Sequence, residues 1–405
     1  MSSLVARQYD AYAYPEPFSD LTEKLATGYF QFGDPALYAP MLWPEGKPRE
    51  RLRILAAGCG TIQAAYLAFT NPSADVTGVD VSESALAHER FLQDRHGLSN
   101  LRLFKGDLRD LGALGDRFDA VVCTGVLHHL QDPAAGLRAL RDVLASSGVM
   151  VLMLYAAARR TGVYMLQDVF RRMQITQDAA GVARVRRMLA QVPAHHFVHW
   201  YVKGARELEH DAALVDTFLH PVDRAYTVPE VLSFVECNGL AFHGWVDNAS
   251  YYPSPFFAPD SEIGQALAPL AVREQWAAVE ALTLTLGTHV FLARLPEAPL
   301  LPVEAALADG SWEKLIPHWS PGGGRAADGT YNRSGLSVRF SEAESLLLGG
   351  IDGVRAAGEL AHHPRLLGYG NDARLGFARQ AFAQAWRLGN IMLSRVPYPR
   401  SPATR

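Results

Sequence analysis

Cysteine is scarce in this sequence of 405 residues and occurs only at Cys59, Cys123 and Cys237. The spacing of the three residues fits neither a disulfide framework nor a zinc site. Cys59 and Cys123 fall at the ends of apolar runs, where a cysteine usually serves as a small buried hydrophobe. This scarcity excludes a disulfide-stapled secreted scaffold, and a cytoplasmic protein is the natural expectation.

Long apolar runs and an excess of charge are also missing. No stretch is apolar for long enough to span a bilayer, and residues 1–10 lack the apolar core of a signal peptide. The net charge is −4, which offers no overall electrostatic reason to bind a nucleic acid or an anionic membrane. We therefore expect neither partner. Hydrophobic residues make up 49% of the chain, and its length suggests two or three domains.

A nucleotide-binding pattern is present in the segment from residue 53 to residue 80. The apolar run 53–57 breaks into Gly58-Cys59-Gly60, which is typical of a buried strand that turns sharply into a helix. A second apolar run, 76–79, ends in Asp80. An acid at the tip of the second strand is placed to accept hydrogen bonds from the hydroxyls of a ribose. On the glycines alone, a tight turn without a ligand and a nicotinamide-binding loop both stay open.

Two further strand ends extend this pattern. A third short strand is predicted at 101–104 and runs into Gly106-Asp107-Leu108. A fourth is predicted at 118–123; it runs into Thr124-Gly125 and then into the apolar and histidine-containing segment 126–130. Four such features in one order and at regular spacing are more specific than any of them alone.

The whole pattern resembles the class I family of methyltransferases that depend on S-adenosyl-L-methionine (SAM), many of them bacterial. The resemblance is strong over about residues 50–156 and looser to about residue 295. It implies an α/β fold, a Rossmann-like seven-stranded sheet with helices on both faces, closed by an antiparallel hairpin. It also implies SAM as the cofactor. A nicotinamide loop fits less well, because it needs a small residue where the large Gln63 stands.

The resemblance assigns the cofactor to the turns after the first four strands and to two tyrosines of the N-terminal segment. These residues are Gly58, Cys59, Gly60, Gln63, Asp80, Val81, Gly106, Asp107, Leu108, Thr124, Gly125, Tyr9 and Tyr14. In the family the acid at Asp107 binds the adenine amino group. The chain departs from the family at Ala56, where an acid usually holds the methionine ammonium, and at Ile62, where a third glycine is common. One hypothesis is that Gln63 supplies the polar group at that end.

Three residues are candidates for a catalytic base: His129, His128 and Tyr155. The sulfonium of SAM already activates the methyl group, so the protein must align an acceptor atom and, for a hydroxyl or an ammonium, remove a proton. Imidazole titrates near neutral pH, which suits that task. The alternative is that these side chains only pack. A second histidine group, His195, His196 and His199, has the spacing of metal ligands but lacks a nearby acid to complete a site, so we predict no metal.

The chain divides into three predicted parts. Residues 1–50 form an N-terminal helical and aromatic lid segment, and residues 51–295 form the SAM-binding domain. A helical cap insertion at 157–225 would roof the acceptor site. After a proline-rich linker, residues 303–405 form a small accessory domain that resembles the winged-helix-like regulatory domains of some bacterial methyltransferases. It would bind a protein or peptide, form a homodimer or buttress the catalytic domain.

These observations predict methyl transfer from SAM to an O or N acceptor of a small molecule or a peptide. Two alternatives stay open. The first alternative is that the protein cleaves or cyclises SAM and releases methylthioadenosine. It stays open because Ala56 and Ile62 alter the methionine end of the turn. The second alternative is a non-catalytic SAM-binding partner protein. The identity of the acceptor is not determined at this level.

Overall fold

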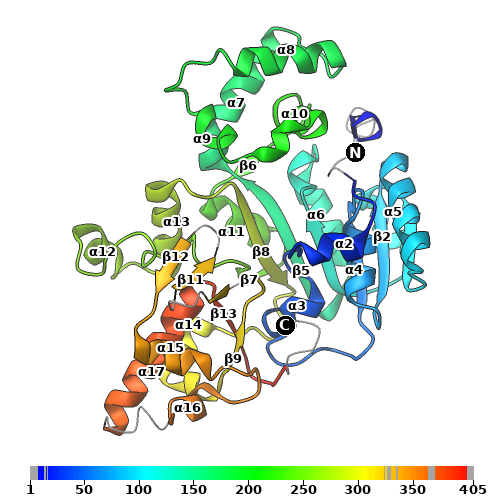
Figure 1. The fold of residues 1–405 in the computed structure, drawn as a ribbon. Coiled ribbons are helices and arrows are strands. Elements are labelled where there is room, and N and C mark those ends of the chain that lie inside the picture. The colour runs from blue at the N-terminus through cyan, green and yellow to red at the C-terminus, as the bar shows by residue number, and fades with distance from the viewer. Residues whose placement is uncertain are drawn as a thin grey trace. The chain divides into compact units, whose positions relative to one another are not determined.

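The computed structural model describes residues 8–12, 15, 17–322, 324–325, 330–333, 336–363 and 370–398. The chain forms two compact units (Figure 1). Unit 1 comprises residues 1–29, 51–242 and 284–296, and unit 2 comprises residues 30–50, 243–283 and 297–405. Two segments that the sequence analysis assigned to the lid and to the SAM-binding domain, 30–50 and 243–283, therefore cluster with the C-terminal region.

The centre of unit 1 is a mixed sheet with the strand order β3-β2-β1-β4-β5-β8-β7, and β6 pairs with β5. Strands β1 to β5 run parallel to one another, whereas β8 runs antiparallel to β5. The strands are β1 Arg53–Ala57, β2 Asp75–Asp80, β3 Leu101–Lys105, β4 Phe118–Thr124, β5 Leu144–Ala156, β6 Ala225–Tyr226, β7 Ala241–Trp245 and β8 Thr288–Arg294. This arrangement confirms the predicted Rossmann-like sheet with an antiparallel final strand.

Helices connect these strands, and short polar signals in the sequence set their starts. Ser82 accepts a hydrogen bond from the N–H of Ala85 at the start of α5, and Thr227 forms a capping box with Glu230 at the start of α11. The elements around the sheet are α2 Leu21–Ala26, α4 Gln63–Thr70, α5 Glu83–His96, η1 Leu108–Leu114, η2 Leu127–His129, α6 Pro133–Asp142 and α11 Val228–Cys237. The strand order reverses between β1 and β4, so ligands are expected at the carboxyl ends of these strands.

Strand β5 begins earlier than its sequence indicates. The local sequence favours a helix from 134 to 145 that stops at Ser146-Ser147-Gly148, but the structure ends α6 at Asp142 and starts β5 at Leu144. Leu144 pairs with Phe118 and is buried, and the register between β4 and β5 shifts before Ala120. Burial of Leu144 in the sheet thus overrides a helix-like local pattern, as tertiary contacts commonly do.

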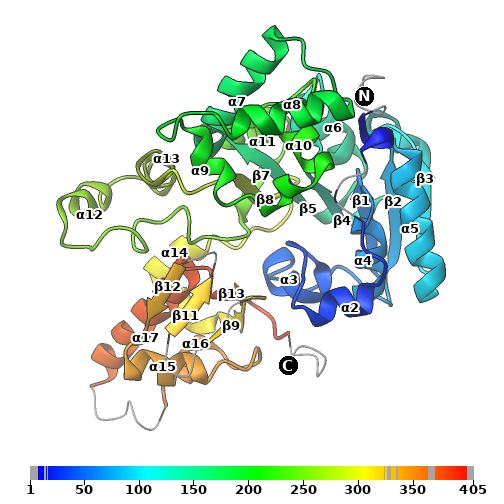
Figure 2. The same ribbon diagram turned by 45° about the horizontal axis from the view of Figure 1, so that its top comes forward.

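The insertion after β5 folds as a helical cap with its own apolar core (Figure 2). Phe170, Val185 and Phe218 belong to that core. The cap consists of α7 Ala157–Arg172, α8 Ala179–Leu189, α9 Val198–Val202, η3 Arg206–Glu209 and α10 Asp211–Phe218. Gly162 lets α7 approach α9 closely, because a Cβ there would lie 2.1 Å from the backbone nitrogen of Val198. Across the described residues, no helix combines the length and apolarity that crossing a bilayer demands.

Unit 2 contains a three-stranded sheet, β10-β11-β12, and a two-stranded sheet, β13-β9. Its core includes Trp312, Leu348 and Phe382. The elements are α3 Pro35–Leu42, α12 Glu262–Leu267, α13 Val272–Thr283, α14 Val303–Asp309, η4 Ser311–Lys314, β9 Ile316–Trp319, β10 Gly324–Arg325, β11 Thr330–Arg333, β12 Leu336–Arg339, α15 Glu342–Gly349, α16 Ala357–Leu360, α17 Asn371–Arg387 and β13 Ile391–Ser394. The winged-helix-like character of residues 303–405 stays a prediction.

Candidate active site

The turn after β1 is built around two glycines and Asp80. Gly58 and Gly60 have φ values of 73° and 58°, and a Cβ on Gly58 would lie 2.4 Å from the Val126 side chain. The carboxylate of Asp80 accepts hydrogen bonds from the N–H of Gly60 at 2.8 Å and from the N–H of Ser82 at 2.9 Å. Asp80 therefore ties the glycine turn to the end of β2.

Asp80 still has the capacity to bind a ribose. Burial raises the pKa of its carboxyl group, and the backbone N–H groups of Ser82 and Gly60 oppose that rise. Each carboxylate oxygen has a second lone pair beyond the one that the backbone uses. Val81 follows directly, and the N–H of Gly106 donates to the Asp80 carbonyl at 2.9 Å. These free lone pairs are compatible with a ribose contact, which remains a prediction.

Helix α4, which starts just after the glycine turn, is capped by a residue that the sequence analysis missed. Ile62 at its N-cap has no hydrogen-bonding side chain; instead Glu89 of α5 accepts from the N–H groups of Ala64 at 2.9 Å and Ala65 at 2.7 Å. Glu89 is fully buried, and burial raises its pKa to about 8. The carboxyl group of Glu89 also meets the buried thiol of Cys59. Its position on the apolar face of α5 was the available signal.

Glu89 should make the stability of the protein fall at mildly alkaline pH. Because its folded pKa is raised from 4.5 to about 8, its contribution is fully present below pH 4.5 and is lost as the pH rises through 8. The free energy of unfolding should drop by about 2 kcal/mol between pH 6.5 and 8. Urea unfolding of Glu89→Gln should show no such drop. The matched control Glu83→Gln, on the exposed face of the same helix, should keep it; equal slopes for wild type and Glu89→Gln would contradict the assignment.

The methionine end of the turn holds an unusual acceptor. The side-chain N–H of Gln63 donates to the hydroxyl of Thr124 at 2.7 Å, while the buried carbonyl oxygen of the same amide has no hydrogen-bond partner within the described part of the chain. A buried acceptor without a partner suits an incoming cationic donor such as an ammonium. Gly125, next to Thr124, has a φ of 79°. The Gln63 amide oxygen is therefore suited to bind the methionine ammonium, in place of the acid that the family usually carries at position 56.

Asp107, the residue predicted to bind adenine, is hydrogen-bonded to Arg109. Its carboxylate accepts from the backbone N–H of Arg109 at 2.9 Å and from the Arg109 guanidinium at 3.0 and 2.9 Å. The side-chain bond to Arg109 holds the pKa of Asp107 well below its ordinary range. Leu108 is buried next to it. The predicted adenine contact of Asp107 is not tested by these distances.

The N-terminal segment crosses the ends of β1 and β2. Asp10 accepts hydrogen bonds from the Ser82 hydroxyl at 2.9 Å and from the Glu83 N–H at 3.1 Å, and the Thr61 hydroxyl donates to the Pro15 carbonyl at 2.7 Å. Tyr9, predicted beside the cofactor, directs its hydroxyl to Asp216 of the cap at 2.9 Å. Tyr14 lies outside the described residues.

Two histidines at the end of β4 and in the cap share one backbone partner. His129 Nδ1 hydrogen-bonds the Val222 carbonyl at 3.1 Å, and the Val222 N–H donates to His220 Nδ1 at 3.1 Å. A carbonyl only accepts, so His129 Nδ1 carries a hydrogen, and in the neutral ring Nε2 keeps a lone pair. An N–H only donates, so His220 carries its hydrogen on Nε2. Val222 thus fixes opposite tautomers on two rings whose centroids lie 3.9 Å apart.

Asp216 supplies a buried negative charge to this pair. One carboxylate oxygen accepts from Tyr9 and lies 3.8 Å from His129 Nε2, and the other accepts from the Tyr155 hydroxyl at 2.9 Å. Burial raises the pKa of Asp216, but His129, His220 and the two tyrosine hydroxyls outweigh it, and the pKa lies below its ordinary value. Because Tyr155 already donates its hydrogen to Asp216, it is placed to orient the acid.

His128 occupies a packing position. It is fully buried, and its ring lies 3.8 Å from the ring of Tyr155. Burial, reinforced by the neighbouring His129 and Arg160, holds the pKa of His128 well below its ordinary value. Burial likewise lowers the pKa of His220 to about 3. Both rings are therefore neutral at physiological pH, and His129 is the candidate base that the geometry favours.

A buried ion pair supports the cluster from the cap. Arg160 of α7 donates to Asp223 at 2.6 Å, and its guanidinium lies 3.7 Å from the centre of the Tyr155 ring. Gln167 also donates to Asp223, at 2.9 Å. Removing one member of a buried pair leaves an uncompensated charge, so the pair locks α7 onto the segment that carries Val222. The sequence analysis missed Arg160, Asp216 and His220 because they lie far from His129 in the chain.

His129, Asp216 and His220 also lie close enough together to hold a metal ion, with one ligand atom of each within 4.8 Å of the others. A histidine that binds a metal normally donates its other ring N–H to an acceptor. His220 does the reverse, since its Nδ1 accepts from Val222. In the other histidine group, His199 Nε2 bonds the carbonyls of Val192 and Pro193, both at 3.1 Å.

Comparison with known proteins places this site in a family. Residues 48–203 match a family model described as a methyltransferase domain. An uncharacterised protein of Synechococcus sp. is 31% identical over 313 residues, which cover 73% of this chain and 72% of that protein. The ubiquinone biosynthesis O-methyltransferase of Cereibacter sphaeroides is 32% identical over 133 residues, 32% of this chain and 48% of that enzyme. The chain thus spans about half the length of that relative.

Two solved structures share the fold. PKMT2 from Rickettsia typhi superposes with a TM-score of 0.62 at 13% identity, covering 91% of this chain and 77% of that chain. The same protein in complex with AdoHcy gives a TM-score of 0.61 at 14% identity, covering 90% and 76%. The chain belongs to the class I SAM-dependent methyltransferases. Its cofactor is SAM, and the assignment of the glycine turn, Asp80 and the Gln63 amide to that cofactor stays a prediction.

Proposed function

We propose that this methyltransferase transfers the methyl group of SAM to a hydroxyl group of a small-molecule acceptor, with His129 as the base. The observation that carries the proposal is the pair of tautomers that Val222 fixes. It sets a lone pair on His129 Nε2 next to an N–H donor on His220 Nε2. The His220 Nε2 is buried and has no hydrogen-bond partner among the described residues.

When bound, SAM supplies a methyl carbon on a sulfonium, which departs as a neutral thioether. The residues of the chain supply the rest. The acceptor hydroxyl gives its proton to His129 Nε2 as the new O–C bond forms and the C–S bond breaks. Asp216, 3.8 Å away, stabilises the imidazolium that results. His220 donates to the second lone pair of the same oxygen and holds it in line.

A hydroxyl suits this arrangement better than an amine. A neutral amine nitrogen has one lone pair, which the attack on the methyl carbon consumes. His220 Nε2–H would then stay buried and unpaired, at a cost of about 1–3 kcal/mol. A hydroxyl oxygen has two lone pairs and satisfies both histidines. The name of the Cereibacter relative, an O-methyltransferase, supports the same acceptor atom.

The test is to incubate the protein and ¹³C-methyl SAM with separated small-molecule and protein fractions of a cell extract. The ¹³C chemical shift of the labelled product distinguishes an O-methyl from an N-methyl group. We expect an O-methyl signal in the small-molecule fraction, equal with and without EDTA. An N-methyl product would overturn the acceptor assignment, and methylthioadenosine formed from SAM alone would overturn methyl transfer. Activity that requires an added metal would overturn the role of His129 as base.

A further inference from the structure

The outer face of the cap exposes large apolar side chains next to the active-site helices. Phe197 is 58% exposed, Trp200 is 61% exposed and Met165 is 46% exposed. The guanidinium of Arg159 on α7 donates to the Trp200 carbonyl at 2.8 Å, and Gly162 packs directly under Phe197 and Val198. These contacts hold the three side chains on neighbouring parts of α7 and α9. We call this set of three the apolar face of the cap.

The inner side of the same short helix faces the buried cluster. Val198 is fully buried in the cap core, and the Tyr201 ring lies 5.5 Å from the guanidinium of Arg160. Helix α9 therefore divides the buried chemistry from the apolar face. Exposed tryptophan and phenylalanine so close together are unusual on the surface of a monomeric protein and mark a contact surface.

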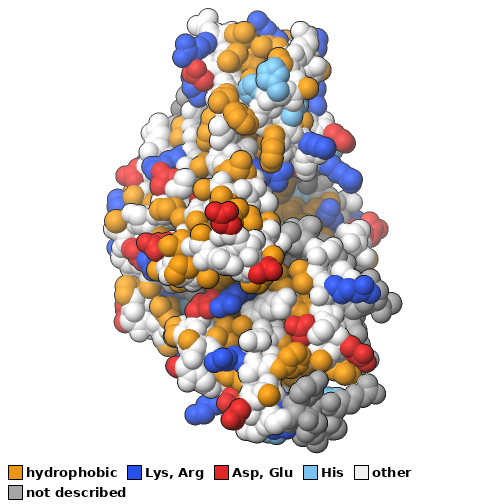
Figure 3. Space-filling view, turned by 90° about the vertical axis from the view of Figure 1, so that its left-hand side faces the viewer, with side chains coloured by type: hydrophobic (Ala, Val, Ile, Leu, Met, Phe, Trp, Pro, Cys, Tyr) orange, Lys and Arg blue, Asp and Glu red, His pale blue; other side chains and the backbone are white. Residues whose placement is uncertain are grey.

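The part of the cap that contains α7, α8 and α9 is cationic, although the whole chain has a net charge of −4 and the rest of the cap carries Glu207, Glu209, Asp211, Asp216 and Asp223. Between residues 157 and 206 the sequence has nine Lys and Arg but only two Asp and Glu. Both acids are engaged: Asp168 pairs with Arg172 at 2.8 Å, and Asp178 caps α8. The exposed cations of this part are Arg171, Arg172, Arg184, Arg187, Lys203 and Arg206. In Figure 3, hydrophobic side chains and a histidine at the top of the molecule are flanked by Lys and Arg.

We propose that the cap docks on the surface of an anionic lipid bilayer. Phe197, Trp200 and Met165 would enter the headgroup region, where aromatic rings and amphipathic side chains are favoured, while the surrounding cations contact lipid phosphates. A nucleic acid would stack on the rings but give Met165 no apolar partner. The overall net charge does not reveal this surface, because most acidic residues lie outside the α7–α9 part of the cap. The proposal goes beyond the methylation chemistry and does not rest on it.

The test is co-sedimentation of the full-length protein with phosphatidylcholine vesicles, with and without phosphatidylglycerol. We expect binding only when phosphatidylglycerol is present, and its loss at high salt. The double variant Phe197→Ser/Trp200→Ser should bind about tenfold more weakly. The charge reversal Arg184→Glu/Arg187→Glu should weaken binding at least as much. Phe91→Ser, which changes an exposed ring on α5, is the matched control and should bind like wild type.

Circular dichroism and SAM affinity should be unchanged in each variant, and the charge reversal keeps the test valid if the apolar variant does not fold. Absence of binding to anionic vesicles, or equal binding by wild type and both cap variants, would overturn the proposal. An RNA oligonucleotide or polyglutamate could also displace the protein from the vesicles. Displacement at a concentration of negative charges below that of the anionic lipid would point to a macromolecular partner and would also overturn the proposal.

Discussion

Replacement of Asp80 by alanine is expected to weaken SAM binding roughly a thousandfold, since two charge-assisted hydrogen bonds to ribose hydroxyls would be lost. The same change frees the N–H groups of Gly60 and Ser82, which the carboxylate holds at 2.8 and 2.9 Å. The glycine turn then loses its tie to β2 along with the ribose ligand. Isothermal titration calorimetry with SAM measures the loss directly.

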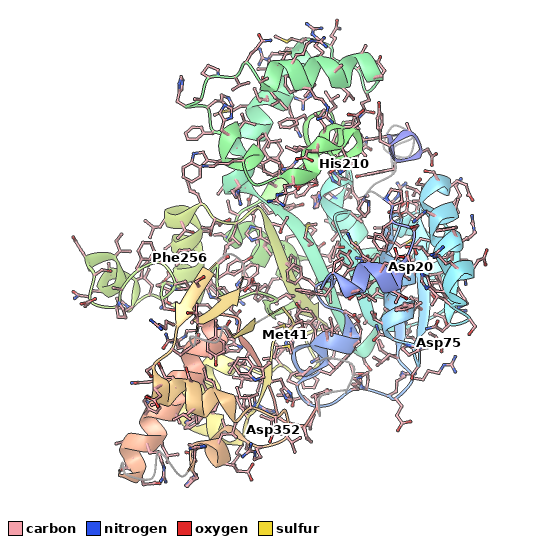
Figure 4. The ribbon with its side chains drawn as sticks, viewed as in Figure 1. Asp20, Met41, Asp75, His210, Phe256 and Asp352 are labelled. Atoms are coloured by element: carbon pink, nitrogen blue, oxygen red, sulfur yellow. The ribbon has the colours of Figure 1, made fainter. Side chains whose placement is uncertain are left out.

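Asp75 provides the matched control, because it lies at the start of the same strand (Figure 4). It is an exposed acid that pairs with Arg51 at 2.6 Å. Asp75→Ala should leave SAM affinity unchanged, since exposed pairs contribute little and this one is far along β2 from the turn. Asp80→Asn keeps the volume but has only one accepting atom, so it should fall between wild type and alanine. Unchanged SAM affinity in Asp80→Ala would refute the ribose assignment.

Replacement of His129 by asparagine is expected to lower kcat by about a hundredfold to ten-thousandfold, the usual range for loss of a general base. The asparagine amide is able to donate to the Val222 carbonyl as Nδ1 does, so the local fold is kept while the free lone pair of Nε2 is lost. SAM affinity should be unchanged, because the histidine acts on the acceptor. Single-turnover kinetics with SAM and the identified acceptor measures the change.

A second variant separates the base from the donor. His220→Phe keeps a ring beside His129 but removes the Nε2–H, so it should lower kcat less than His129→Asn does. Tyr9→Phe removes only one of the two hydroxyls on Asp216 and should have a smaller effect than either. If His129→Asn had the same kcat as wild type, the assignment of His129 as the base would be wrong. An acceptor that binds already ionised would then be the simplest explanation.

The cofactor half of the site was largely predictable. The Gly58-Cys59-Gly60 turn and Asp80 sit at successive strand ends, and parallel strands bring such ends to one edge of a sheet. Gln63 was a hypothesis from its place in the turn, and its buried carbonyl oxygen, which has no hydrogen-bond partner among the residues that the structure describes, suits an ammonium. Glu89 was missed, because a carboxyl group on the apolar face of a helix gives no sign of which neighbouring helix it caps.

The acceptor half was predictable only in part. The sequence put His129 before His128 as the candidate base and predicted that one of the pair packs; in the structure His128 packs on Tyr155, while His129 faces Asp216. Tyr155 looked like a base, yet its hydroxyl hydrogen is given to Asp216. The cap insertion was recognised as helical, but which of its polar residues would reach His129 depends on how helices α7 and α10 pack, and helical periodicity leaves that open.

The sequence by itself determined the class of fold, the cofactor and the end of the sheet where the chemistry lies. Those follow from short-range patterns: apolar runs, glycines that permit positive φ, and acids at strand ends. Only the tertiary structure decided which histidine keeps a free lone pair. Val222 lies 93 residues after His129, and its carbonyl and N–H set the two tautomers only once the cap has folded over β4 and β5. A proton position that depends on so distant a backbone group leaves no local trace in the chain.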